Sequence, residues 1–395
     1  MSSPTPGSSA ARVRLTAALA SEDAIALLAC PDAEGDLLAA AASVRDRVWG
    51  RTITYSPKVF LPVTNLCRDR CTYCTFRKDP GDPDAWTMSP GDVRAWSARG
   101  RALGCIEALM CLGDKPELAF PSHRETLRAL GHATTVEYLR RACEIALESG
   151  LLPHTNAGVL SREEMVALRP VNVSMGLMLE SVSERLRGRG GVHQWAPDKE
   201  PRLRLAMLEE AGRLRIPFTT GLLLGIGETL VERVETLAAI AAAHRRHGHV
   251  QEVIVQSFRA KPTIARSGGE EPDAHALART IAIARLLLPP EVSVQAPPNL
   301  SAPDEHALLL AAGVNDWGGI SPLTPDYVNP EAPWPHVAAL TSTCRRAGYD
   351  LVPRLPIYDR YRERAEFLDP ALRATVGRRA EEIAPSSASW TEASS

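Results

Sequence analysis

Residues 58–77 read KVFLPVTNLCRDRCTYCTFR, a short apolar run followed by three closely spaced cysteines. The apolar part, residues 59–63, predicts a buried strand that ends where the polar loop begins. The loop carries its cysteines in the spacing CxxxCxxC, at Cys67, Cys71 and Cys74. Three thiolates at this spacing can bind three irons of a cuboidal iron–sulfur cluster, whereas a structural zinc site normally has four Cys or His ligands. The fourth iron would then be open to a small molecule.

The spacing alone also fits a redox disulfide or an incomplete zinc knuckle. The other cysteines lie in apolar or helical contexts, and we expect them to be small buried residues: Cys30, Cys105, Cys111, Cys143 and Cys344. Eight cysteines among 395 residues do not make a disulfide scaffold, so the clustered thiols fit a reducing compartment.

The composition excludes several classes of function. The chain has 45 basic and 47 acidic residues and no basic block, so nucleic acid is not expected as a partner. No apolar run reaches the roughly 18 residues that would span a bilayer, and the first residues lack the apolar core of a signal peptide. We therefore expect a cytoplasmic protein without a membrane partner.

From residue 59 onward, short apolar runs alternate with amphipathic helical patterns, which is typical of βα units around a parallel sheet. The predicted strands are 59–63, 105–112, 152–156, 171–179, 216–224, 252–258 and 292–295. The predicted helices are 90–103, 134–149, 161–168, 199–212, 229–247, 273–288 and 304–312. These units fit either a barrel or a doubly wound sheet, and the absence of GxGxxG after the first strand weakens the dinucleotide-binding version of the sheet.

Composition and periodicity divide the chain into four parts. We expect disorder in residues 1–12, which are rich in Ser, Pro, Gly and Ala, and a helical N-terminal cap over 13–50. The barrel would occupy 51–370. Residues 371–395 would form a helical end and a disordered tail.

In a barrel of this kind, the chemistry lies at the carboxyl ends of the strands. Polar or glycine-rich segments do follow the predicted strands. They are GDKPE (113–117), HTN (154–156), ES (180–181), GIGE (225–228), RAKP (259–262) and the later loop NDWGGISPLTPDYVNPEAPWP (315–335). Their common position predicts one functional rim.

With an aromatic residue, Tyr73, just before the third cysteine, the loop resembles the signature of the radical S-adenosylmethionine superfamily. The flanking sequence TNLCRDRCTYCTF (64–76) is closer still to the first-subunit type of 7,8-didemethyl-8-hydroxy-5-deazariboflavin (FO) synthase. The resemblance extends from about residue 54 to 358 through LPHTNAG, VSMGLMLES, RIPFTTGLLLGIGET, QEVIVQSFRAKP and the 315–335 segment. It implies a TIM-like (β/α) barrel, full or partial.

The resemblance also implies cofactors and their ligands. The three cysteines would hold a 4Fe-4S cluster, with Arg68, Arg70 and Arg77 favouring their thiolate form. S-adenosylmethionine would bind the open iron. Contacts to it are implied for Tyr73; for Gly113, Asp114 and Lys115 beside the methionine amino group; for Glu180 at the ribose; for Arg185 at the carboxylate, with Arg187 and Arg189 competing; and for Gly225 and Glu228 near the adenine. Relatives in the superfamily often have two glycines and a glutamate after the second strand, and GDKPE departs from that pattern.

The implied reaction is formally that of a lyase. A 5′-deoxyadenosyl radical abstracts a hydrogen from 5-amino-5-(4-hydroxybenzyl)-6-(D-ribitylimino)-5,6-dihydrouracil, which then cyclises with loss of ammonia to the deazaflavin. A second FO synthase subunit would supply this small-molecule substrate, and an electron donor would reduce the cluster. Expected substrate contacts are His154, Asn156, Arg259, Lys261, Asp316 and Tyr327, whereas Trp317 and Trp334 are expected to pack the end of the barrel.

Three alternatives remain open on sequence alone. The chain could be the partner subunit, which joins a tyrosine-derived 4-hydroxybenzyl group to 5-amino-6-(D-ribitylamino)uracil, or a related menaquinone-pathway enzyme. It could be a non-catalytic metal-cluster protein. An RNA-modifying radical enzyme would need a basic appendage, against which the balanced charge argues.

Overall fold

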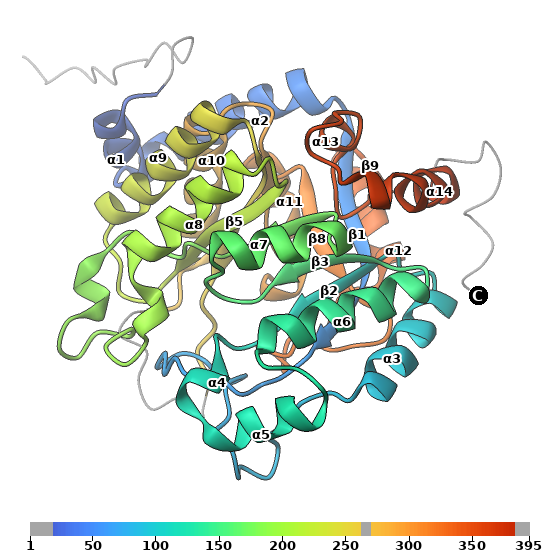
Figure 1. The fold of residues 1–395 in the computed structure, drawn as a ribbon. Coiled ribbons are helices and arrows are strands. Elements are labelled where there is room, and N and C mark those ends of the chain that lie inside the picture. Colours follow the sequence, from blue (N-terminus) through green and yellow to red (C-terminus); the bar gives the residue numbers. More distant parts are fainter. Residues whose placement is uncertain (1–18, 262–269, 384–395) are drawn as a thin grey trace, which may run out of the picture.

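The computed structural model describes residues 19–261 and 270–383. Eight parallel strands form a closed barrel, in which each strand pairs with the next and β8 returns to β1. The strands are β1 (Thr52–Pro62), β2 (Glu107–Cys111), β3 (Leu152–Asn156), β4 (Ser174–Gly176), β5 (Phe218–Leu224), β6 (Val250–Ser257), β7 (Ser293–Gln295) and β8 (Asp316–Ile320). The expected TIM-like barrel is confirmed, and it is closed rather than partial (Figure 1).

A ninth strand, β9 (Asp350–Pro353), joins the sheet outside this ring. β1 is 11 residues long, and its edge away from β8 pairs with two strands. Residues 52–55 pair with β9, and residues 58–62 pair with β2. The chain after β9 therefore starts at the amino end of the barrel.

The seven strands predicted from apolar runs are all present; β3 has the predicted ends, and the other six differ at one or both ends. β8 was missed, because its sequence DWGGI lies in the segment expected to be a loop and contains two glycines, which are poor strand formers. A Cβ at Gly318 would collide with the side chain of Gln295, and one at Gly319 with Lys58. Because side chains inside the barrel approach the β8 backbone this closely, these two positions have no room for a Cβ.

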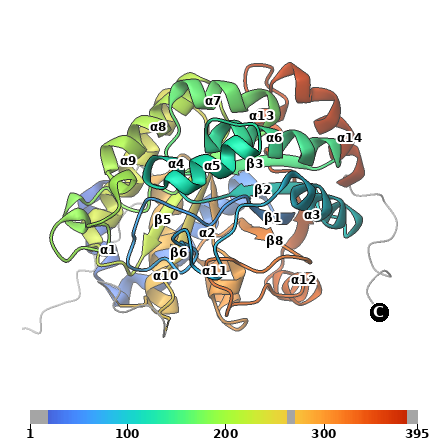
Figure 2. The same cartoon turned by 60° about the horizontal axis from the view of Figure 1, so that its bottom comes forward.

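Helices surround the strands (Figure 2). Five helices have a side-chain N-cap: in each case below, the capping side chain accepts a hydrogen bond from a backbone N–H in the first turn. Ser89 caps α3 (Pro90–Ala102), Thr134 caps α6 (Thr135–Glu148), Ser161 caps α7 (Arg162–Leu168), Thr229 caps α9 (Leu230–His247) and Asp273 caps α10 (Ala274–Leu287). The remaining helices between strands are α4 (Pro116–Ala119), α5 (Pro121–Ala129), η2 (Arg169–Val171), η3 (Glu184–Arg187), η4 (Pro197–Lys199), α8 (Pro201–Arg213), η5 (Pro298–Leu300), α11 (His306–Ala311) and α12 (Val337–Arg346).

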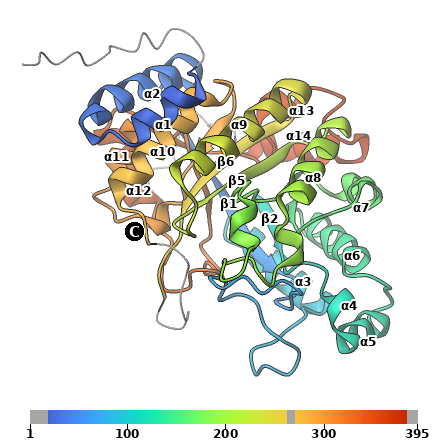
Figure 3. The same cartoon turned by 90° about the vertical axis from the view of Figure 1, so that its left-hand side faces the viewer.

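Before β1, the chain forms α1 (Ser21–Leu28), η1 (Pro31–Ala33) and α2 (Glu34–Trp49). These helices pack on the outside of the barrel against α9, α10 and α11 (Figure 3). Their apolar faces join the main core through Leu28, Leu37, Leu38 and Ala41. The expected disorder of residues 1–12 concerns residues outside the described part of the chain.

After β9, the chain forms α13 (Asp359–Arg362), η6 (Pro370–Leu372) and α14 (Arg373–Ile383). Their apolar side chains make a second core with Ile106, Leu152 and Val173, which precede or begin β2, β3 and β4. This segment therefore covers the amino end of the barrel and leaves the carboxyl end open. The expected disordered tail lies beyond the described residues, and none of the described helices is long and apolar enough to cross a membrane.

Candidate active site

The barrel encloses a cavity of about 400 Å³. Cys67, Cys71 and Cys74 line it on the loop after β1, at the carboxyl ends of the strands. Arg354, which follows β9, lines it at the amino end. The predicted rim and the centre of the barrel thus share one continuous space.

Hydrogen bonds from Asn65 fix the start of the cysteine loop. Its amide donates to the backbone carbonyl of Asp84 (2.7 Å) and accepts from the backbone N–H of Trp86 (2.8 Å). Cys67 is 8% exposed, and its sulfur accepts a hydrogen bond from the backbone N–H of Asp114, 3.1 Å away. A Cβ on Gly113 would collide with the backbone carbonyl of Leu66, so only glycine lets the loop after β2 approach the cysteine loop this closely.

The expectation that arginines stabilise the thiolates is wrong, because each guanidinium pairs with a carboxylate instead. Arg68 pairs with Asp198, and both Arg70 and Arg77 pair with Asp79. Burial, together with the nearby Asp69 charge, raises the pKa of the Cys67 thiol to about 12, and burial also raises the pKa of Cys71. Metal binding at these thiols must therefore displace protons.

Three buried aspartates, Asp69, Asp114 and Asp198, lie next to the cysteine loop, with one oxygen of each within 4.8 Å of the others. Asp198 pairs with Arg68, and Asp69 accepts from the backbone N–H of Asp198 (3.0 Å). In Asp114, Oδ2 accepts from the backbone N–H of Val159 (2.9 Å), but Oδ1 has no partner among the described residues. Burial and the Asp198 charge raise the pKa of Asp114 to about 7. The unpaired oxygen faces a site that suits a cation.

A second network surrounds Glu180, which is 8% exposed and lines the cavity. The phenol of Tyr73 donates to Glu180 Oε2 (2.5 Å), and Lys199 Nζ lies 2.5 Å from Oε1. His193 Nε2 lies 2.9 Å from the Tyr73 hydroxyl. Burial disfavours the charged form of Glu180, but Lys199, His193 and Arg204 together outweigh burial and hold the pKa of Glu180 well below its usual range. Glu180 is therefore a fixed carboxylate at the rim.

Four residues expected to contact the cofactor do not line the cavity. Lys115 pairs with Glu164 (3.0 Å), and Arg185 donates to the backbone carbonyl of Gly227 (2.6 Å) and pairs with Glu232 (2.8 Å). The Glu228 carboxylate accepts from the backbone N–H groups of Gly225 and Ile226, at 3.0 and 2.9 Å, which holds the turn after β5. These side chains support the loops of the rim from outside.

Most of the expected substrate contacts do line the cavity: His154, Asn156, Arg259, Lys261 and Tyr327. Asp316 does not, because it begins β8 at the amino end and lies fully buried below the cavity. Trp317 is also fully buried and donates to the sulfur of Cys344 (3.4 Å). Trp334, expected to be a packing residue, stacks on Phe60 (5.2 Å between ring centroids) and lines the cavity.

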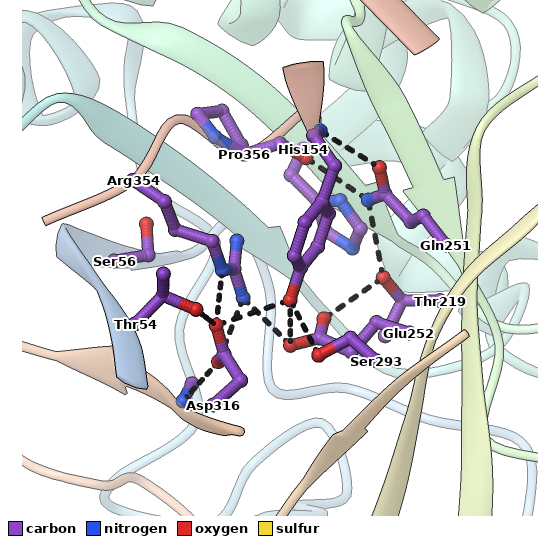
Figure 4. Close-up of polar contacts among 12 residues, drawn as sticks. Thr54, Ser56, His154, Thr219, Gln251, Glu252, Ser293, Asp316, Arg354 and Pro356 are labelled. Atoms are coloured by element: carbon purple, nitrogen blue, oxygen red, sulfur yellow. Dashed lines mark hydrogen bonds and ion pairs between the residues drawn. The ribbon is translucent and has the colours of Figure 1, made fainter. Parts of the chain in front are cut away.

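The floor of the cavity is a network of buried polar side chains around Arg354 (Figure 4). The Arg354 guanidinium donates to both oxygens of Asp316 (2.5 and 3.0 Å) and to Glu252 Oε1 (2.6 Å). Glu252 also accepts from Thr219 (3.1 Å). Burial raises the pKa of Glu252, and the Asp316 charge adds to that effect, while Arg354 opposes it. Arg354 thus pairs with two buried carboxylates at once.

Sequence reasoning missed several cavity-lining residues: Asp69, Lys199, Arg204, Gln251, Glu252 and Arg354. Arg204 is 5% exposed and donates to the backbone carbonyls of Met178 (3.0 Å) and Asp198 (3.0 Å). Lys199 and Arg204 fall in a segment expected to be an ordinary helix, where both read as solvated charges. A signal was present for Asp69, which lies inside the CxxxCxxC loop, and for Gln251 and Glu252, which lie in the segment QEVIVQSFRAKP.

Comparison with known proteins agrees with this geometry. Residues 61–240 match the model of the radical SAM superfamily. The FO synthase of Mycobacterium tuberculosis is 48% identical over 372 residues, which is 90% of this chain and 44% of that protein. The chain therefore spans less than half the length of this relative. The 7,8-didemethyl-8-hydroxy-5-deazariboflavin synthase of Methanothermobacter thermautotrophicus is 46% identical over 84% of this chain and 98% of that protein.

Solved structures confirm the fold. The FeFe-hydrogenase maturase HydG from Carboxydothermus hydrogenoformans superposes with a TM-score of 0.69 at 19% identity, covering 92% of this chain and 82% of that one. Methylornithine synthase (PylB) gives a TM-score of 0.67 at 16% identity, covering 85% and 95%. Because it covers 98% of the methanogen protein at 46% identity, the chain belongs to the 7,8-didemethyl-8-hydroxy-5-deazariboflavin (FO) synthase family of the radical SAM superfamily.

Proposed function

We propose that this chain is a radical S-adenosylmethionine lyase that completes the deazaflavin ring system. It converts 5-amino-5-(4-hydroxybenzyl)-6-(D-ribitylimino)-5,6-dihydrouracil into 7,8-didemethyl-8-hydroxy-5-deazariboflavin with loss of ammonia. The observation that carries this proposal is the position of three cysteines on the loop after β1, at the open end of a cavity of about 400 Å³, in a chain of this family.

The residues present fit the cluster and S-adenosylmethionine. Three cysteines supply three ligands, at Cys67, Cys71 and Cys74, and leave one iron open. When bound, the cluster and S-adenosylmethionine supply a carbon radical that removes a hydrogen from the substrate. The unpaired Oδ1 of Asp114 suits the α-ammonium group, because a cation there satisfies a buried acceptor that has no partner in the described chain.

Other contacts to S-adenosylmethionine follow from the same rim. Glu180, held ionised by Lys199, would accept hydrogen bonds from the ribose hydroxyls. Tyr73 fixes the orientation of that carboxylate through its hydroxyl. Lys115, Arg185, Gly225 and Glu228 would act from outside the cavity by holding the loops that carry these groups.

The substrate would occupy the barrel interior. Aromatic rings near the open end, Phe60 and Trp334 in one stack and Tyr327 close to Phe76, offer a surface for the hydroxybenzyl ring. His154, Asn156, Arg259 and Lys261 add polar groups to the lining of the cavity. The helices and the covered amino end keep bulk water away from a reactive intermediate.

A second polypeptide, or a second half of a longer chain, would supply this substrate. The match to 44% of the M. tuberculosis FO synthase leaves more than half of that protein for another activity. An electron donor is also needed, because the cluster must be reduced before each radical is formed.

The test is an anaerobic assay of the cluster-loaded protein with reductant and S-adenosylmethionine. The synthetic 4-hydroxybenzyl adduct should give 5′-deoxyadenosine and the fluorescent deazaflavin without tyrosine or a partner protein. The Cys71→Ala variant should give neither product. Product formation only from tyrosine plus 5-amino-6-(D-ribitylamino)uracil would assign the partner activity instead.

A further inference from the structure

Two groups of polar side chains in the cavity lining differ in whether they have partners within the protein. Those on the floor already have partners within the protein: Lys58 pairs with Glu107 at 2.9 Å, and Arg354 pairs with Glu252 at 2.6 Å. Gln251 donates to the backbone carbonyl of Pro356 at 3.0 Å. These contacts close the amino end of the barrel, and a ligand would have to compete with them.

Three carboxamides form the second group: Asn156, Gln256 and Gln295. All three side chains line the cavity, and none makes a hydrogen bond to the part of the chain that the structure describes. Gln295 is only 6% exposed. A carboxamide that loses water without gaining a partner costs about 1–3 kcal/mol, so a ligand that fills this cavity must offer hydrogen-bonding groups to them.

Two of these carboxamides lie on neighbouring strands. Gln295 is in β7, opposite Ile254 of β6 in the strand register. Gln256 is two residues beyond Ile254 and so projects to the same face of β6. The offset of one strand and two residues puts the Cα atoms of Gln256 and Gln295 about 8 Å apart. Both amides can therefore reach one small ring, whereas Asn156 lies on β3, across the barrel in the strand order.

The neighbouring strand leaves room for the Gln295 amide. Gly318 of β8 has a φ of +68°, and a Cβ there would collide with the Gln295 side chain. Any other residue at position 318 would be strained and would displace that amide. The glycine that made β8 hard to predict thus belongs to the wall around Gln295.

We propose that Gln256 and Gln295 recognise the cyclic imide edge of a pyrimidinedione, an assignment that rests on the proposed function. This edge presents a carbonyl, an N–H and a second carbonyl in a row. Each carboxamide offers an NH₂ donor and a carbonyl acceptor, so the pair can satisfy all three positions. The uracil ring of the substrate and the deazaflavin product both carry this edge, and both would bind through it.

Replacing a carboxamide by a carboxylate tests the proposal with little change in shape. Gln295→Glu or Gln256→Glu replaces a donor with an acceptor that faces a carbonyl. Cluster-loaded protein without S-adenosylmethionine is titrated with the deazaflavin product, and binding is followed by its fluorescence. Each variant should bind about tenfold to a hundredfold more weakly than the wild type. Gln194→Glu is the matched control, because Gln194 lies outside the cavity and, in the described chain, only accepts a hydrogen bond from the backbone N–H of Gly190. The affinity of this variant for the deazaflavin should equal that of the wild type.

A ligand variant makes the assignment specific to the imide. A deazaflavin methylated at the imide nitrogen should bind wild type weakly, and the two Gln→Glu variants should then lose little further affinity. The proposal is overturned if both variants, melting like wild type, bind the unmodified deazaflavin equally well, or if they lose affinity equally for both ligands.

The titration tests the proposed subsite and the turnover assay tests the proposed reaction, so either proposal can be rejected without the other. Glutamine-dependent binding without conversion of the adduct would support this subsite and reject the proposed reaction. Conversion of the adduct by wild type and by both variants with the same KM would reject this subsite alone.

Discussion

The two ends of the barrel interior balance their buried charges in opposite ways. At the amino end, Arg354 contacts both Asp316 and Glu252 within hydrogen-bonding distance. At the carboxyl end, Asp114 keeps an oxygen without a partner in the described chain, beside the buried thiol of Cys67. The carboxylates of the floor are therefore paired within the protein, whereas Asp114 at the rim has an oxygen left for a ligand.

Because of this difference, substitutions at the floor should change mainly the stability of the fold, and substitutions at the rim should change mainly ligand binding. Removing one member of a satisfied buried network leaves the others uncompensated, which is costly for folding. Removing a group whose partner is an external ligand changes affinity more than folding, since the protein already bears the cost of the unsatisfied atom. Substitutions at the two ends should thus be read out by different measurements.

The largest effect is expected at the cysteine loop. Cys71→Ala should lower the iron content after anaerobic reconstitution from about four per chain to less than about one, because two thiolates cannot hold the cluster. Iron and sulfide analysis measures this directly. Cys30 was expected to be buried but is exposed, and it lies outside the loop, so Cys30→Ala should retain the full content. Full iron in Cys71→Ala would exclude this loop as the cluster site.

At the floor, Arg354→Met should lower the free energy of unfolding by about 3–5 kcal/mol, because it leaves Asp316 and Glu252 as buried charges without their cation. Urea denaturation of the two proteins gives the difference. Arg362→Met is the control, since Arg362 pairs with the exposed Asp359, and it should cost less than about 1 kcal/mol. Similar losses in both variants would show that the floor network does not hold the barrel closed.

Asp114→Asn should weaken S-adenosylmethionine binding to the cluster-loaded protein about tenfold to a hundredfold, since a neutral amide replaces the carboxylate facing the ammonium group. Equilibrium dialysis measures the affinity. Lys115→Met is the neighbouring control: its ammonium pairs with Glu164 outside the cavity, so the affinity should change less than about threefold. If Lys115→Met has the larger effect, the ammonium group is held elsewhere.

The elements that could be predicted from the sequence are those determined locally. Apolar runs located β2, β3 and β5, and the helical patterns over 90–103 and 229–247 located α3 and α9. The rule that polar residues follow parallel strands placed His154, Asn156 and Tyr327 on the cavity. The division into a cap over 13–50, a barrel over 51–370 and a tail stays a prediction.

The elements that could not be predicted depend on pairs far apart in the chain. Arg354 meets Glu252 across 102 residues, and no local pattern indicates that the two side chains pair. Asp316 was placed at the rim because it precedes a polar loop, but the glycines of β8 are strand residues facing Gln295 and Lys58. Arg185 was expected at the cofactor, yet Glu232 on α9 binds it instead, which no local pattern indicates.

The smallest expected effect concerns His154, which is 7% exposed and lies within hydrogen-bonding distance of Ser174 (2.7 Å). Burial lowers its pKa to about 4; Glu107 opposes this shift, and Lys58 adds to it. An unfolded histidine has a pKa of about 6.5, so below that pH the unfolded chain binds the extra proton first. The stability that neutral His154 contributes is therefore complete above about pH 6.5 and is lost as the pH falls towards 4.

His154→Gln removes this titration while keeping a polar side chain in the cavity wall. Between about pH 7.5 and 5.5, wild type should lose about 1 kcal/mol more unfolding free energy than the variant, measured by urea denaturation at each pH. Other buried histidines, such as His249, also lower the free energy of unfolding as the pH falls over this range. They do so in both proteins, so their contribution cancels in the comparison. Equal losses in the two proteins would mean that His154 is protonated as readily in the folded chain as in the unfolded one. The paired network at the amino end of the barrel would then include Arg354 but not His154.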